Sequence, residues 1–139
     1  MRDLEQTARM IYILINLVPI LLATSAGLAI GYGWLQMGRQ RRVVRAPLIV
    51  LAALGEGWFA AILAGALILA PPRADPWIMA IGSAVVIWAG FVAPAVAISL
   101  TAAGSRPRVV VGAVLHWLAV MVAQAVVLKL YGLVPPPGA

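Results

Sequence analysis

Four long apolar stretches divide the chain, and short polar segments separate them. They cover about residues 10–37, 47–70, 77–101 and 109–131. Each stretch contains the ~20 residues that an α-helix needs to cross a hydrocarbon core of about 30 Å. Residues 109–120 do not alternate between apolar and polar positions, which disfavours a membrane β-barrel. The pattern therefore predicts an all-α polytopic membrane protein with four transmembrane helices.

The three connections between these stretches, residues 38–46, 71–76 and 102–108, are short. Short connections make consecutive helices antiparallel, so we expect a single up-down four-helix bundle over residues 1–139. Small residues at positions 23–26 resemble a signal-peptide cleavage site. Because the apolar run continues past Ala26, we expect the first segment to be retained as a helix.

Composition narrows the function classes. Hydrophobic residues make up 64% of the chain and charged residues 10%, against about 45–50% and 25% in soluble domains. This hydrophobicity excludes intrinsic disorder, and the absence of cysteine excludes disulfides and thiolate metal sites. One histidine and four carboxylates provide few acid, base or metal-ligand sets, so we predict no enzyme activity and no metal site.

The positive charge is distributed unevenly along the chain. Six arginines lie in the first and third connections, against four Lys and Arg residues on the opposite side. The positive-inside rule therefore predicts both termini on the non-cytoplasmic side of a bacterial inner membrane. Four of the six arginines follow the first helix directly, where we expect them to contact anionic lipid headgroups and not nucleic acid. They are Arg39, Arg41, Arg42 and Arg45.

Small residues on the predicted helices mark candidate packing positions. Gly27 and Gly31 share one stripe of the first helix, while Gly90 and Gly112 lie on the third and fourth. Small side chains let transmembrane helices approach closely, so these four glycines are predicted to pack helices together. Pro94 is expected to bend the third helix and to free the carbonyl of Gly90.

Two ionisable residues lie inside the predicted spans. Glu56 follows Pro47 by nine residues and His116 follows Arg108 by eight, which places them ~13.5 Å and ~12 Å from the same membrane face. A charged carboxylate at this depth costs at least ~2.5 kcal/mol, so Glu56 should face the bundle interior and be paired or protonated. Either the pair exchanges protons or binds a cation, or it forms a neutral hydrogen bond between two helices.

Two further polar features involve the first and last helices. Asn16 and Gln124 are predicted to pair near the non-cytoplasmic side, where side-chain amides commonly join helices. Gly112 precedes His116 by one helical turn, a spacing that would let a flat macrocycle lie beside an axial ligand. We expect no cofactor, and a haem or chlorophyll-type pigment at His116 is the alternative.

Several short motifs resemble a known family. The chain is similar to the bacterial four-helix membrane family catalogued as domain of unknown function 1761, over about residues 26–130. The resemblance implies a small integral membrane protein and supplies no catalytic residue. It is carried by Gly31-Tyr32-Gly33-Trp34, Gly90-Phe91-Val92-Ala93-Pro94, Arg106-Pro107 and His116-Trp117.

Two classes of function remain open. The sequence favours an accessory or scaffold subunit that packs against lipids, other membrane helices, a pigment-bearing complex or a second copy, because this role requires only apolar helices with small-residue stripes. The alternative is a small proton- or cation-linked transporter in which Glu56 and His116 form the intramembrane site.

Overall fold

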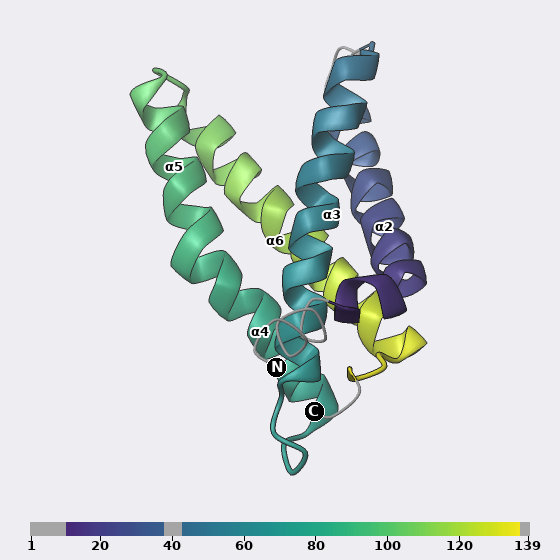
Figure 1. Ribbon diagram of the computed structural model, residues 1–139. Helices are drawn as coiled ribbons and strands as arrows, with labels where there is room; N and C mark the ends of the chain where they lie inside the picture. Colours follow the sequence, from purple (N-terminus) through teal and green to yellow (C-terminus); the bar gives the residue numbers. More distant parts are fainter. Residues whose placement is uncertain (1–10, 38–42, 137–139) are drawn as a thin grey trace, which may run out of the picture.

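The computed structural model describes residues 11–37 and 43–136 and consists of helices joined by short turns (Figure 1). Residues 11–15 are helical and are followed by α2 (Leu17–Gln36) and α3 (Ala46–Ile68). A single span, Pro76–Ala102, combines α4 (Pro76–Ile87), η1 (Trp88–Val92) and α5 (Ala93–Ala102), and α6 (Pro107–Tyr131) completes the bundle. No strand occurs in these ranges. Four helices are long and apolar enough to cross a membrane, which confirms the predicted all-α membrane fold.

Proline residues define where the helices begin. Pro47, Pro76 and Pro107 occupy the first or second position of α3, α4 and α6, where a missing N–H leaves no hydrogen bond unmade. Asp75 also caps α4, because its Oδ1 accepts the N–H groups of residues 77 and 78 at 2.9 Å. In the first span, Pro19 cannot bond to the carbonyl of Ile15. A single turn residue, Asn16, accordingly separates the helical residues 11–15 from α2, which begins at Leu17.

The third span contains a wide helical turn just before Pro94. In the π-helix η1, the N–H of Ala93 donates to the carbonyl of Trp88. Pro94 has no N–H for the carbonyl of Gly90, so the irregularity expected at the proline takes the form of a π turn. The Trp88 indole Nε1 donates to the backbone oxygen of Val114 at 2.9 Å, which links this turn to α6.

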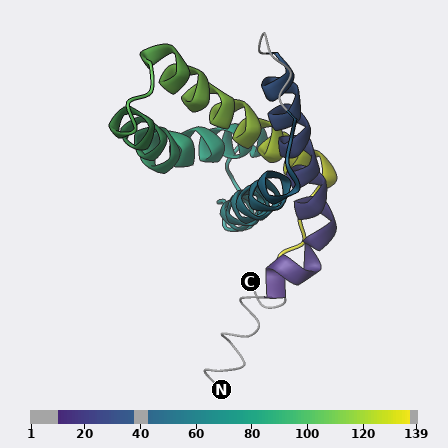
Figure 2. The same ribbon diagram turned by 90° about the horizontal axis from the view of Figure 1, so that it is seen from above.

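The last helix is the centre of the bundle. α6 packs against α2, α3, α4, η1 and α5, and its longest interface is with α2. α3 contacts α4 but not α5. Figures 1 and 2 agree that α5 and the α5–α6 connection lie away from α3, whereas α6 itself crosses α3. The bundle is therefore closed at the α4 end and open between α3 and α5.

Small side chains dominate the core, together with the large buried residues Leu63, Met121 and Leu128. Such a composition lets helix backbones approach closely in lipid. The fully buried alanines are Ala23, Ala60, Ala64, Ala80, Ala84 and Ala125.

The predicted packing glycines differ in their surroundings. A Cβ on Gly112 would lie 3.8 Å from Trp34 Cζ2, so α2 and α6 are in van der Waals contact there. Gly90 is exposed, and a Cβ at this position would meet nothing within 4 Å. The prediction that Gly90 packs helices of this chain is therefore wrong for the described residues, because Gly90 lies on a face of the third span that no other helix covers. Pro94 is likewise exposed, in the first turn of α5.

Candidate intramembrane polar site

Glu56 is buried at the interface of α3 with α2, and only 3% of its surface is exposed. Its carboxyl group lies directly against Gly27. A Cβ on Gly27 would overlap Glu56 Oε2 and would lie 3.1 Å from Glu56 Cδ. Gly31, one turn further along α2, has Glu56 Oε1 at 3.7 Å from its Cβ position. The absence of side chains at these two glycines thus creates the space that the carboxyl group occupies.

Two side chains of α6 complete this site. Gln124 is fully buried, and its Nε2 donates to the backbone oxygen of Glu56 at 3.0 Å. His116 is half-buried, and its Cε1 lies 3.7 Å from the Cβ position of Gly31. We call Glu56, His116 and Gln124 the polar cluster. Its members come from α3 and α6 and gather around Gly27 and Gly31 of α2.

Each member of the polar cluster has a buried polar atom without a hydrogen-bond partner in the described part of the chain. These atoms are Glu56 Oε2, His116 Nδ1 and Gln124 Oε1. An unsatisfied buried polar group costs about 1–3 kcal/mol. At this site, α6 is hydrogen-bonded to α3 by the Gln124 side chain, which donates to the backbone oxygen of Glu56. The polar cluster therefore combines free hydrogen-bonding capacity with burial of the three atoms that provide it.

The aromatic surroundings of His116 bear on the pigment alternative. Its ring centroid lies 5.5 Å from that of Trp34 and 5.6 Å from that of Trp117. Trp34 also covers Gly112, at 3.8 Å from its Cβ position, which is the surface where a macrocycle would have to lie. The residues as placed therefore do not fit a haem or chlorophyll at His116. Within residues 11–37 and 43–136, no three His, Cys, Asp or Glu residues are grouped to hold a metal ion.

Asn16 and Gln124 do not form the predicted pair. Asn16 Nδ2 donates to the carbonyls of Tyr12 and Val134, both at 2.9 Å. The Val134 N–H donates to Asn16 Oδ1 at 2.8 Å, whereas Gln124 bonds to Glu56. The prediction was wrong because the partner of Asn16 is backbone beyond α6, which a search for polar side chains does not find.

The arginine cluster is described only in part. Arg39, Arg41 and Arg42 lie outside the described residues. Arg45 is exposed and immediately precedes α3. Its contact with anionic lipid headgroups stays a prediction.

Comparisons with family models, curated proteins and solved structures gave no match to the chain. The resemblance to the four-helix family therefore stays a prediction that rests on the motifs quoted above.

Proposed function

We propose that this multi-pass membrane protein is a small proton- or cation-linked transport component, and that the polar cluster is its binding site. The observation that carries the proposal is the gathering of three buried polar atoms without partners at Glu56, His116 and Gln124. Ionisable groups inside membrane spans are costly, and they commonly mark proton or ion pathways.

The chemistry of the three groups supports binding of a positive species. A carboxylate oxygen and an amide oxygen are acceptors, and a neutral imidazole nitrogen can be one. A proton on Glu56 would convert one acceptor into a donor, and a small cation would be attracted to the same oxygens. Gly27 and Gly31 keep the space beside the carboxyl free of side-chain carbon. In this role Glu56 holds the proton or cation, and His116 and Gln124 stabilise the occupied form.

Glu56→Gln tests the proposal, because it preserves size and hydrogen bonding but cannot exchange a proton. Infrared difference spectra of the purified protein between acidic and alkaline pH should contain a carboxylic C=O band that this variant lacks. In liposomes containing a pH-indicator dye, an applied membrane potential should drive a proton flux that the variant reduces at least tenfold.

Asp75→Asn is the matched control, since Asp75 is an exposed carboxylate outside the polar cluster and asparagine also caps helices. It should retain both the infrared band of Glu56 and the flux. If Glu56→Gln and the parent give the same spectra and fluxes, the polar cluster has only a structural role.

The open side of the bundle favours a second candidate, the accessory subunit. α3 and α5 do not contact each other, and exposed aromatic residues lie on α3 (Trp58) and on η1 (Phe91). In this role a partner helix would pack against the faces of these spans that the chain itself leaves uncovered. Mass measurement after mild extraction separates the two candidates. A stable complex with other chains that Trp58→Arg dissociates would support the accessory role, whereas an isolated chain or homodimer with proton flux would support transport.

We further propose that the α2–α3 and α5–α6 connections face the cytoplasm and that both termini face the other side, as the arginine distribution predicts. Reporter domains fused to Met1 and to Ala139 should both report a non-cytoplasmic location. A cytoplasmic signal from either fusion would contradict this orientation. An alkaline phosphatase and a fluorescent-protein fusion at each end serve as reciprocal controls.

A further inference from the structure

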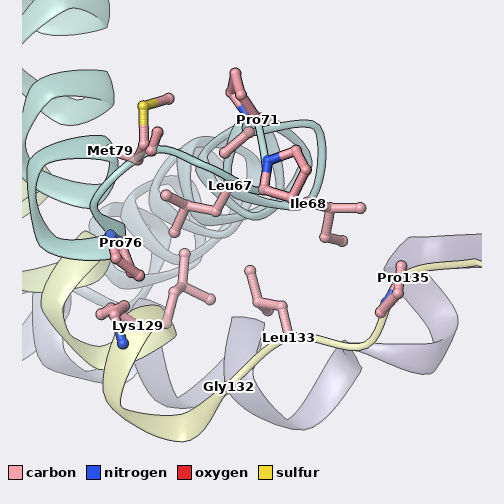
Figure 3. A pocket seen from close by; sticks show the side chains of 13 residues that line it. Leu67, Ile68, Pro71, Pro76, Met79, Lys129, Gly132, Leu133 and Pro135 are labelled. Atoms are coloured by element: carbon pink, nitrogen blue, oxygen red, sulfur yellow. The ribbon is translucent and has the colours of Figure 1, made fainter. Parts of the chain in front are cut away.

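A surface pocket of about 340 Å³ lies at the end of the bundle where α3 ends, α4 begins and α6 ends (Figure 3). Along the chain this end is opposite the one where Arg45 precedes α3. The walls expose both apolar and polar atoms, and most of the lining side chains are apolar. They are formed by Leu67, Ile68, Ala70, Pro71, Pro72, Ala74, Pro76, Met79, Leu128, Lys129, Gly132, Leu133 and Pro135.

Among the described residues that line this pocket, Lys129 is the one whose side chain carries a charge. It lies in the last turn of α6, and its Nζ lies 5.4 Å from the centroid of the Trp77 ring. Asp75, at the nearby start of α4, uses its carboxylate to accept two backbone N–H groups of that helix. The pocket thus combines a single cation with an apolar surface, which is complementary to an amphiphilic anion.

One wall of the pocket is held in place by hydrogen bonds between residues that are far apart in the sequence. Gly132 ends α6 with φ of 87°, a conformation that favours glycine, and turns the chain away from the helix axis. Asn16 is 1% exposed, and it binds both the N–H and the carbonyl of Val134. The segment that contributes Leu133 and Pro135 is therefore fixed against α2, so the pocket is a built feature of the fold.

We propose that this pocket binds an anionic phospholipid of the adjacent leaflet, with the phosphate at Lys129 and part of one acyl chain against Leu67, Ile68 and Leu133. The end of a membrane span is the level at which lipid headgroups lie, and a lysine there attracts anionic lipid. The pocket volume falls near the lower limit of about 300–1,000 Å³ for ligand pockets, enough for part of one lipid. A free phosphate ion would leave the apolar walls unused.

Native mass spectrometry of the full chain in detergent tests this site. Phosphatidylglycerol and phosphatidylcholine with identical acyl chains are added separately, and the bound fraction is measured for each. The parent should retain phosphatidylglycerol more strongly than phosphatidylcholine. Lys129→Gln should weaken phosphatidylglycerol binding about fivefold, since one lysine near the surface contributes about 1 kcal/mol.

Two further variants locate the binding. Arg73→Gln removes an exposed cation in the connection between α3 and α4. Because Arg73 does not line the pocket, this substitution should change phosphatidylglycerol binding less than twofold. Ala70→Phe fills the apolar part without changing the charge, and it should also weaken phosphatidylglycerol binding. Thermal unfolding of each variant verifies that it is folded. Equal losses for Lys129→Gln and Arg73→Gln, equal binding of the two lipids, or displacement by glycerol phosphate would overturn the proposal.

Discussion

Replacement of Gly27 by leucine is expected to prevent α2 from packing against α3 and α6. Even a Cβ at this position would overlap Glu56 Oε2 and lie 3.0 Å from Gln124 Nε2, so a full leucine has no space. The displaced carboxyl and amide groups would have to move within a close-packed interior of alanines and leucines. Overpacking alone costs about 1–3 kcal/mol of stability, and displacing the Glu56 and Gln124 side chains adds to this cost. We therefore expect the free energy of unfolding to fall by more than about 3 kcal/mol.

Thermal unfolding in detergent, with the amount of monodisperse protein recovered, measures the effect. Gly33→Leu is the matched control on the same helix, because a Cβ at Gly33 would meet nothing within 4 Å. Gly31→Ala should be tolerated as well, since its Cβ would be at an ordinary contact distance of 3.7 Å from Glu56 and His116. If the Gly27→Leu variant unfolds at the same temperature as the parent, then Gly27 does not pack against Glu56 and Gln124.

The second large effect is expected for Leu63→Ala in α3. Leu63 is fully buried, and it is among the largest side chains in the alanine-rich core. In a bilayer the surrounding lipid is as apolar as leucine, so the transfer term is small and lost packing accounts for the change. We therefore expect a destabilisation of about 2 kcal/mol, at the lower end of the range for leucine truncations in soluble cores.

Reversible unfolding in mixed detergent and dodecyl sulfate measures this difference. Leu54→Ala is the control, because the same substitution on the same helix removes a side chain that is 69% exposed toward the lipid side. It should change stability by less than about 0.5 kcal/mol. Equal destabilisation by both substitutions would mean that α3 is rotated about its axis relative to the structure.

The spans were predictable because hydropathy alone determines them. α3, α4 and α6 begin within two residues of the expected positions. Each starts after a residue with extended backbone and has a proline at its first or second position. The break at Asn16 in the first span was not predicted, since the effect of Pro19 on the helix depends on local backbone geometry. Asn16 was predicted to pair with Gln124, but it bonds to the backbone of Tyr12 and Val134 instead. Its partner was missed because any backbone group can accept or donate a hydrogen bond.

The polar cluster was predicted in part. Glu56 and His116 were predicted to lie at about the same depth in the membrane. The small-residue stripe of Gly27 and Gly31 was also visible in the sequence. Gln124 was placed nearer the opposite face, because depth was counted along straight helices normal to the membrane. Tilted helices and long side chains bring it to the backbone of Glu56. Which residue faces which glycine depends on helix rotation, and hydropathy does not specify rotation.

The central position of α6 has a consequence for the order in which the protein is made. Among the described spans, α2 emerges from the ribosome first and α6 last, yet these two share the longest interface. α3 and α5 have no contact of their own, so the earlier spans cannot complete their packing with one another. Until α6 enters the bilayer, Glu56 lacks the amide of Gln124 and the imidazole of His116. Assembly of the bundle is therefore a late event in synthesis, and a chain truncated before α6 would carry the Glu56 carboxyl group in the membrane without the helix that covers it.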